Sequence, residues 1–311
     1  MSGSALLFAA LVAQPAMADA QLVSPPEASA SPTIVEGLQP GGAIQGRVDT
    51  DERMTVDVRI GGRGPYRFLV DTGSQSTVVS RTLAGELGLA PGPDVLVMGM
   101  AGSQVVTTRQ LGLLQIGPHA FRDLTVPLLD AGDLGADGLI GTDSLQDQRV
   151  VLDFVSNTIG IEEVPGAAAE RRNANSGYEI IVNASRRLGR LILTNAMIDG
   201  VRTSVVIDTG ASGTVGNAAL QQALRKQPAG KATLTSVTGH DLPADLGIAD
   251  RLHIGKLYVT NVSIAYAASP VFAELGLDKK PAIFLGMREL RGFKRIAIDF
   301  SKHKVLFDLP D

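Results

Sequence analysis

The sequence contains no cysteine and no tryptophan, and only 4% of its 311 residues are aromatic. The absence of cysteine excludes disulfide bonds, a thiolate nucleophile and zinc sites with cysteine ligands. The four histidines match no metal-binding spacing and stand at scattered positions: His119, His240, His253 and His303. We therefore expect chemistry that needs neither a metal ion nor another cofactor.

The sequence also lacks a long run of charge of either sign, and its formal net charge is only −4. Proteins that bind nucleic acid usually carry a basic stripe, so we expect no nucleic-acid partner. What the sequence does have is 44% hydrophobic residues and 35 glycines. Its apolar runs are short and rich in β-branched residues, with turn residues between them, which predicts an all-β fold.

An apolar run at residues 5–13 has the length of a signal-peptide core and is too short to span a bilayer. Two A-x-A cleavage patterns follow, ending at Ala18 and Ala20. No Lys or Arg precedes the run, so a disordered tail or an uncleaved anchor is the alternative. We predict a signal peptide at 1–20 and an exported chain with no stable membrane span after cleavage. Since the chain has no cysteine, the expected compartment is the bacterial periplasm.

The rest of the chain divides into a spacer and two larger units. Residues 21–52 are rich in Pro, Ala, Ser and Gly, which predicts a spacer ending in one strand; a propeptide is the alternative interpretation. Two units of ordinary domain size are expected at 53–163 and 177–311, joined by a polar connector at 164–176. Each unit is long enough to bury a core of its own.

One short motif occurs twice. "FLVDTGS" ends a predicted strand at residues 68–74, and "VVIDTGA" ends another at 205–211. A lone Asp-Thr-Gly is best explained as a strand-ending turn, since all three residues suit turns. Two copies, each preceded by apolar residues, indicate instead a unit that was built twice, with one carboxylate in each copy.

The repetition extends beyond this motif. "GLIGTDSL" (138–145) corresponds to "IFLGMREL" (283–290), and "RVVLDF" (149–154) corresponds to "RIAIDF" (295–300). The segments follow the same order in both halves, with a spacing that drifts by only a few residues. We infer an internal duplication with insertions in the loops.

Asp71 and Asp208 are the candidate catalytic residues. Hydrolysis of a peptide bond needs a base that takes a proton from water and an acid that protonates the substrate. Two adjacent carboxylates can do both, because they do not both ionise easily and so share one proton. Five neighbours are expected to support the pair by close backbone approach or by hydrogen bonds: Thr72, Gly73, Ser74, Thr209 and Gly210.

The two motifs, with the paired "GLIG" and "IFLG" segments, resemble the aspartic peptidases, specifically a retropepsin-like type fused into one bilobal chain. The chain is also similar to exported bacterial retropepsin-like proteases, over residues 53–309. The resemblance implies an all-β, bilobal acid-protease fold with two retropepsin-like β-barrel lobes, in which the paired segments cross in a psi-shaped arrangement. It also implies an endopeptidase that binds a polypeptide in extended conformation. Because one chain carries both halves, we expect a monomer. Aspartic proteases are the standard example of two carboxylates that share one proton.

Members of this family close a hairpin flap over the substrate, and two segments of the chain resemble such flaps. Their tips would supply substrate-binding residues: Met100, Ala101 and Gly102 in one half, Thr238 and Gly239 in the other. An ordinary β-hairpin without a lid function is the alternative interpretation. Both segments lack the tyrosine of pepsin-type flaps, which favours the retropepsin comparison.

Differences between the halves bear on pH and on the other acidic residues. The Ser74 hydroxyl could donate to the first carboxylate, whereas the Ala211 side chain cannot donate to the second. A lost donor raises the pKa of a carboxyl group, so we expect a mildly acidic to near-neutral optimum. Asp143 is expected to cap a helix. Asp153 and Asp299 are expected to face out of a strand or to hold a turn.

We predict an aspartic endopeptidase. The alternative from another class is a non-catalytic periplasmic peptide-binding or scaffold protein with the same fold. A degenerate copy would normally have lost an Asp or a Gly of the motif, and neither loss has occurred. A third alternative, in which each half acts only in a dimer with another chain, is unnecessary because one chain carries both halves.

Overall fold

The computed structural model describes residues 12–15, 43–146, 148–163, 178, 180–225 and 228–310. Most of the expected signal peptide, most of the spacer and the whole connector at 164–176 lie outside the described residues. The strand expected at the end of the spacer is present as β2 (Ala43–Val48). The short strand β1 (Val12–Pro15) pairs with β19 (Gly230–Thr235), in the second half of the chain.

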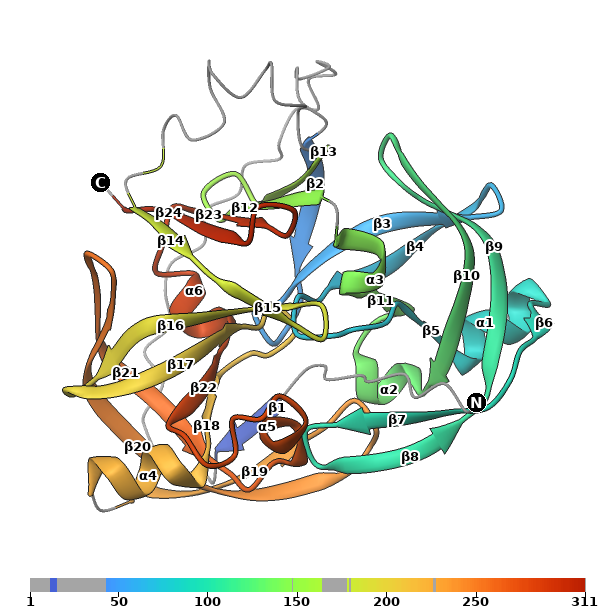
Figure 1. Cartoon of the computed structure of the whole chain (residues 1–311). Coiled ribbons are helices and arrows are strands. Elements are labelled where there is room, and N and C mark those ends of the chain that lie inside the picture. Colours follow the sequence, from blue (N-terminus) through green and yellow to red (C-terminus); the bar gives the residue numbers. More distant parts are fainter. Residues whose placement is uncertain are drawn as a thin grey trace, which may run out of the picture.

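The fold is all-β and has two lobes, which confirms the prediction (Figure 1). Blue to green elements from β3 onward form the N-terminal lobe and yellow to red elements form the C-terminal lobe, with which the dark blue strand β1 also lies. The first half contributes β3 (Met54–Ile60), β4 (Arg63–Val70), β5 (Val78–Ser80), α1 (Arg81–Leu87), β6 (Ala90–Pro91), β7 (Val95–Gly99), β8 (Gly102–Val106), β9 (Thr108–Ile116), β10 (His119–Leu129), α2 (Ala131–Leu134), β11 (Gly138–Ile140), α3 (Thr142–Leu145), β12 (Gln148–Asp153) and β13 (Thr158–Glu163).

The second half repeats much of this order. Its remaining elements are β14 (Ile180–Asn183), β15 (Ser185–Arg187), β16 (Arg190–Ile198), β17 (Val201–Ile207), β18 (Thr214–Gly216), α4 (Ala218–Leu224), β20 (Asp241–Ile254), β21 (Leu257–Tyr266), α5 (Pro270–Glu274), β22 (Ala282–Leu285), α6 (Met287–Leu290), β23 (Arg295–Asp299) and β24 (Lys304–Asp308). In each lobe, the strand before Asp-Thr-Gly is followed by a short strand and a short helix.

The same crossing of strands occurs in both lobes. β11 lies between β4, to which it runs parallel, and β5, to which it runs antiparallel. β22 lies in the same way between β17 and β18. The psi-shaped arrangement that the family resemblance implies is therefore present twice. β11 and β22 are apolar and buried, as are the last three residues of β4 and of β17, which anchors the loop that leaves β4 or β17 in the core of its lobe.

Local sequence explains why the flanking elements form. In β3, Val56, Val58 and Ile60 are buried while Arg59 is exposed, as the alternating pattern predicts. The Ser80 side chain caps α1 by accepting the backbone N–H of Leu83 at 3.2 Å. Asn217 caps α4 in the same way, at 2.9 Å.

The two repeated "DF" segments pair with each other between the lobes. β12 and β23 run antiparallel, and β13, β2, β24 and β14 extend this sheet on its two sides. Arg149 forms an ion pair with Asp299 at 2.7 Å in this sheet. Asp299 is fully buried, so it does not face out of the strand, and its carboxylate holds the following turn through the Lys302 N–H. Asp153 also holds a turn, by accepting the N–H of Ser156.

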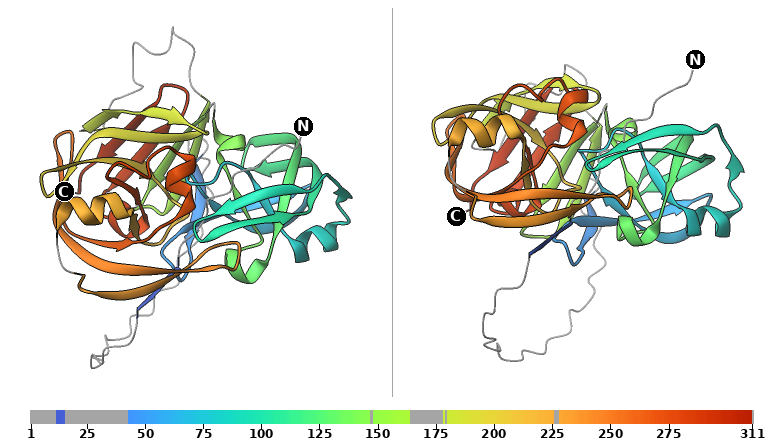
Figure 2. Two further views of the ribbon diagram at one scale, coloured as in Figure 1. Left: turned by 60° about the horizontal axis from the view of Figure 1, so that its bottom comes forward. Right: turned by 90° about the horizontal axis from the view of Figure 1, so that it is seen from below.

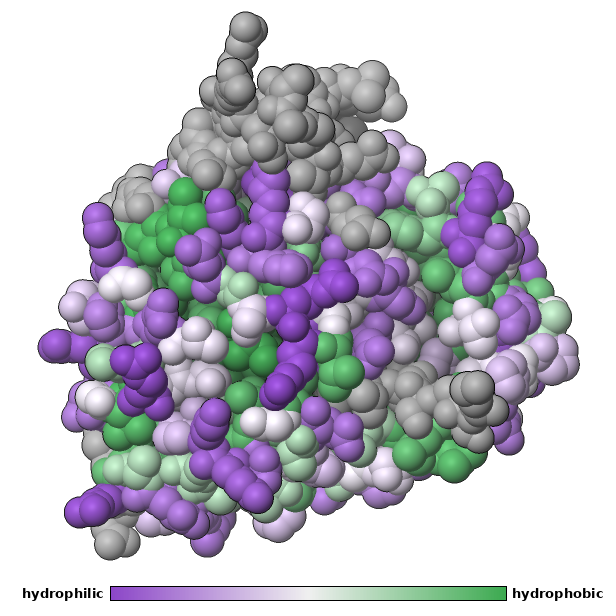
Figure 3. Space-filling model, viewed as in Figure 1, coloured by the Kyte–Doolittle hydropathy of each residue, from purple (hydrophilic) through white to green (hydrophobic). Residues whose placement is uncertain are grey.

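The surface mixes polar and apolar residues over both lobes, on the face that Figure 3 shows. Several large apolar side chains are exposed, among them Val105 and Tyr258. In the part of the chain that the structure describes, no helix has the length and apolar character needed to cross a membrane.

Candidate active site

Asp71 and Asp208 stand at equivalent positions of the two lobes. Asp71 follows β4 and donates its backbone N–H to the carbonyl of Ile140, at 3.0 Å. Asp208 follows β17 and donates to the carbonyl of Leu285, also at 3.0 Å. These carbonyls belong to the inserted strands β11 and β22, so the strand crossing fixes where each aspartate leaves its strand.

Thr72 and Thr209 join the two loops by hydrogen bonds between the lobes. The Thr72 hydroxyl donates to the carbonyl of Ile207 at 3.0 Å, and the Thr209 hydroxyl donates to the carbonyl of Val70 at 2.7 Å. Each hydroxyl also accepts the backbone N–H of the opposite threonine, at 3.1 and 3.2 Å. Both side chains are buried. The bonds are reciprocal, so movement of one loop relative to the other would break several at once.

Gly73 and Gly210 lie where the loops approach each other. A Cβ atom at Gly73 would overlap the carboxyl group of Asp208, and one at Gly210 would overlap that of Asp71. Each carboxyl group therefore packs directly on the backbone of the opposite loop. No residue larger than glycine fits at either position without displacing a carboxyl group.

The Asp71 carboxyl group accepts hydrogen bonds from its own loop. Its Oδ1 accepts the backbone N–H of Gly73 at 2.8 Å and that of Ser74 at 3.0 Å. The Ser74 hydroxyl does not donate to Asp71, contrary to our expectation, and donates instead to the carbonyl of Ser76 at 2.9 Å. The loop turns its backbone N–H groups toward the carboxyl group, so the hydroxyl is directed to the other side of the turn.

The Asp208 carboxyl group has the same kind of partners. Its Oδ1 accepts the N–H groups of Gly210 and Ala211, at 3.0 and 3.2 Å. In both loops the donors are backbone N–H groups, so the Asp208 carboxyl group loses no hydrogen bond by having Ala211 where the first loop has Ser74. The expected asymmetry between Ser74 and Ala211 is therefore absent from the contacts of the two carboxyl groups.

Burial controls the titration of this pair. It raises the pKa of Asp71 well above its usual range, and the nearby charge of Asp208 raises that pKa further. Burial also raises the pKa of Asp208, to about 6. Backbone N–H groups, the Arg190 guanidinium and a hydrogen bond with the Asp71 carboxyl group oppose this rise. A buried pair of this kind can hold one proton at weakly acidic pH.

A second symmetric feature braces both loops, and it corrects one expectation. Gly141, not Asp143, is the N-cap of α3; the Asp143 carboxylate accepts the hydroxyl of Thr77 at 2.7 Å as well as the backbone N–H of Ser144. In the other lobe, Glu289 accepts the hydroxyl of Thr214 at 2.5 Å. Glu289 is three residues after the glycine of its segment, whereas Asp143 is two residues after the corresponding glycine. The longer side chain of glutamate compensates for this shift of one position. A direct alignment of the two halves places Arg288 opposite Asp143, so it does not show that Asp143 and Glu289 correspond.

Arg190 is a buried residue beside the pair that the motifs did not single out. Its Nε donates to the carbonyl of Gly73 at 2.7 Å. Burial lowers its pKa to about 9, while the charges of Asp71 and Asp208 favour its charged form. Arg190 stands 18 residues before Asp208, and Arg53 stands 18 residues before Asp71. An arginine repeated at one distance from the motif was the signal that could have identified it.

The first expected flap is a two-stranded sheet formed by β7 and β8. Met100 and Ala101 form its turn, and Gly102 begins β8. Met100 is buried in an apolar cluster of the C-terminal lobe, where its sulfur accepts the Ser269 hydroxyl at 3.6 Å. The hairpin tip therefore reaches across to the opposite lobe.

The second hairpin, β19–β20, reaches in the other direction, toward α2 (Figure 2). Val237, 137 residues after Met100, is buried in an apolar cluster of the N-terminal lobe. Thr238 is also buried, whereas Gly239 is exposed with a φ of 73°. A Cβ at Gly239 would lie 2.8 Å from the Asp133 carboxyl group. The five residues expected at flap tips thus lie on two hairpins, and each hairpin buries an apolar residue in the opposite lobe.

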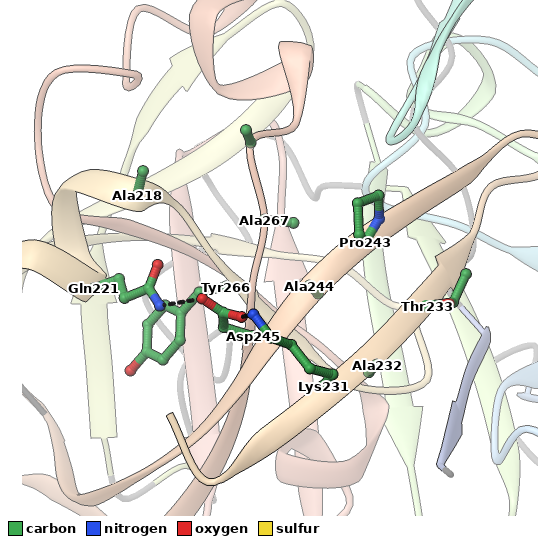
Figure 4. A pocket seen from close by; sticks show the side chains of 11 residues that line it. Ala218, Gln221, Lys231, Ala232, Thr233, Pro243, Ala244, Asp245, Tyr266 and Ala267 are labelled. Carbon is green, nitrogen blue, oxygen red and sulfur yellow. Dashed lines mark hydrogen bonds and ion pairs between the residues drawn. The ribbon is translucent and has the colours of Figure 1, made fainter. Parts of the chain in front are cut away.

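A pocket of about 790 Å³ lies elsewhere in the C-terminal lobe, and none of its lining residues belongs to the two aspartate loops (Figure 4). Its one acidic lining residue, Asp245, accepts the Gln221 amide at 2.8 Å and forms an ion pair with Lys231. The pocket therefore lacks the two carboxyl groups that hydrolysis would use. Within the described ranges, no three His, Asp or Glu side chains lie where they could hold a metal ion.

The fold and the paired loops define a bilobal chain of the acid-protease class. A family model described as aspartyl protease matches residues 56–144 and 194–288, one segment in each lobe. The two segments cover more than half of the chain, so the chain belongs to this family. A comparison with curated proteins found no match.

Proposed function

We propose that the chain is an aspartic endopeptidase and that Asp71 and Asp208 act as one catalytic pair. The observation that carries the proposal is the contact between the two loops: each carboxyl group is buried against the glycine of the opposite lobe. Burial raises the pKa of both carboxyl groups, which favours sharing of one proton. The protonated carboxyl group can then act as the acid and the ionised one as the base in the hydrolysis expected of the family.

In the proposed reaction, the ionised carboxylate takes a proton from a water molecule. The water oxygen attacks the carbonyl carbon of the peptide bond, while the protonated carboxyl group gives its proton to the carbonyl oxygen. The resulting diol loses a hydroxyl proton as the amine nitrogen gains one, and the C–N bond breaks. One proton again remains on the pair. Thr72 and Thr209 support this exchange by keeping the two loops in register.

We further propose that the two hairpins cover an extended polypeptide substrate. Met100 and Val237 hold the tips against opposite lobes, so a substrate must displace at least one tip to enter between them. Ala101, Gly102, Thr238 and Gly239 are then the residues nearest the bound backbone. An extended peptide suits such a site, because its free N–H and C=O groups can pair with strands on either side.

Three features of the predicted biology are also proposals: the monomeric state, the export and the pH optimum. A single chain carries both aspartates, which supports a monomeric enzyme. The apolar run at 5–13, with its A-x-A patterns, supports export to the bacterial periplasm. The raised pKa of about 6 at Asp208 supports a mildly acidic to near-neutral optimum.

Cleavage of an unfolded protein mixture tests the proposed function. The purified chain and its Asp71→Asn variant would be incubated with the mixture between pH 4 and pH 8, and the products would be mapped by mass spectrometry. We expect internal cuts by the wild type and none by the variant, with Asp57→Asn, at an exposed carboxylate, as the control. A folded wild type that binds peptides but cuts none would support the peptide-binding alternative.

A further inference from the structure

Arg190 links the C-terminal lobe to the catalytic loop of the N-terminal lobe. It begins β16, directly after the β15–β16 turn formed by Leu188 and Gly189. A Cβ at Gly189 would lie 2.5 Å from the Thr142 hydroxyl, so this turn is pressed against α3 of the other lobe. The hairpin thereby brings Arg190 to the interface between the lobes.

The guanidinium group contacts the peptide group that joins Gly73 and Ser74. Its Nε donates to the Gly73 carbonyl at 2.7 Å, and its Nη1 donates to the carbonyl of Leu188 at 3.2 Å. The N–H of the same peptide group, at Ser74, donates to Oδ1 of Asp71 at 3.0 Å. A positive charge at one end of this peptide group polarises it and strengthens the hydrogen bond at the other end.

This arrangement is not repeated in the other lobe. Arg53 is the equivalent arginine and is just as buried, but its guanidinium forms an ion pair with Asp49 at 2.8 Å. It also donates to the carbonyl of Leu134, at 3.2 Å. Two arginines at equivalent positions thus serve different partners, and Arg190 is the one bonded to a catalytic loop.

We propose that Arg190 is a positioning residue that acts on the catalytic pair through the Gly73–Ser74 peptide group and keeps one negative charge on the pair at weakly acidic pH. The inference rests on the proposed function, because it assigns a role to the pair of aspartates. Arg190 itself remains at a distance from the substrate and transfers no proton.

Electrostatics agree with this geometry. The Arg190 charge lowers the pKa of both Asp71 and Asp208, against the larger effect of burial. Burial lowers the pKa of Arg190 only to about 9, so the group stays charged where the pair would work. A buried cation is costly unless an anion compensates it, which couples the charge of Arg190 to that of the pair.

The test compares Arg190→Gln, Arg190→Lys and Arg53→Gln across pH, after each variant has been checked for folding. Removing the positive charge raises the pKa of both carboxyl groups, so the profile of kcat/KM against pH should move to higher pH by about one unit in Arg190→Gln. Arg190→Lys keeps a charge and should restore much of the wild-type position. Arg53→Gln should leave the profile in place even if it lowers stability.

A second readout needs no activity, so it separates failure of this inference from failure of the proposed function. Titration of the carboxyl carbons by NMR, with assignment by Asp71→Asn and Asp208→Asn, should show higher pKa values for the pair in Arg190→Gln than in the wild type. Equal values in both proteins, or an equal shift in Arg53→Gln, would overturn the proposal. A wild type that titrates as expected but cuts no peptide would contradict only the proposed function.

Discussion

At the scale of single residues, Gly210 leaves room for the Asp71 carboxyl group. In Gly210→Ala the new methyl group would overlap that carboxyl group and push it out of position. We expect a loss of activity of about a hundredfold, because small displacements of reacting groups are costly, and destabilisation by about 1–3 kcal/mol from overpacking. Gly213→Ala is the matched control, since a Cβ there meets nothing within 4 Å. Peptide-cleavage rates and urea unfolding would measure both effects, and equal behaviour of the two variants would contradict the contact.

The titration of the pair predicts how stability depends on pH. The pKa of Asp208 is about 6 in the folded protein and about 3.9 in an unfolded chain, so folding favours proton uptake between these values. The free energy of unfolding should therefore fall as pH rises from about 4 to about 6, by about 3 kcal/mol for this group. The raised pKa of Asp71 extends the fall to higher pH.

Urea unfolding at pH 4 and pH 7 would measure this change. The double variant Asp71→Asn/Asp208→Asn lacks both carboxyl groups, so it should lose much less stability over the same interval. If both proteins respond to pH equally, the pair is not the source of the dependence.

At the scale of elements, the two hairpins connect the lobes through their tips. In Met100→Ala the tip of β7–β8 loses its buried contact with the C-terminal lobe, at a cost of about 2 kcal/mol. The loss should appear as faster hydrogen exchange in β7 and β8, while exchange in β4 and β11 stays slow. Leu96→Ala is the control on the same hairpin, because Leu96 is 38% exposed. Unchanged exchange in Met100→Ala would mean that the buried tip does not hold the hairpin closed.

The sequence alone predicted the elements that repeat. The two Asp-Thr-Gly motifs identified the ends of β4 and β17, and the paired "GLIG" and "IFLG" segments identified β11 and β22 as repeated elements. These features depend on nearest neighbours along the chain, so a local pattern records them.

Features that depend on distant neighbours were missed or wrongly assigned. Asp143 binds Thr77, 66 residues away, rather than capping its own helix. Ser74 turns its hydroxyl away from Asp71 because the backbone already supplies the donors. Arg190 donates a hydrogen bond to Gly73, 117 residues before it. No local periodicity encodes which side chain faces which loop, and only the folded chain determines it.

At the scale of the whole molecule, one sheet joins the lobes through β12 and β23. Arg149 and Asp299 form an ion pair in this sheet with almost no exposure to solvent. Arg149→Ala would leave Asp299 buried without this charge partner, so we expect the free energy of unfolding to fall by about 3 kcal/mol or more. Arg47→Ala breaks an exposed pair with Asp57 and should cost less than about 1 kcal/mol. Similar losses in the two variants, measured by urea unfolding, would show that the pair between the lobes contributes little.

The central claim is that one aspartate from each lobe forms a single hydrolytic unit. The most direct test is a double-mutant cycle of peptide-cleavage rates with Asp71→Asn, Asp208→Asn and the variant that carries both. Residues that act as a unit are strongly non-additive. Each single substitution should therefore lower the cleavage rate by about a thousandfold or more, and the double variant should cleave no more slowly than either single variant. A single variant that keeps the wild-type rate, or losses that multiply in the double variant, would contradict a shared catalytic pair.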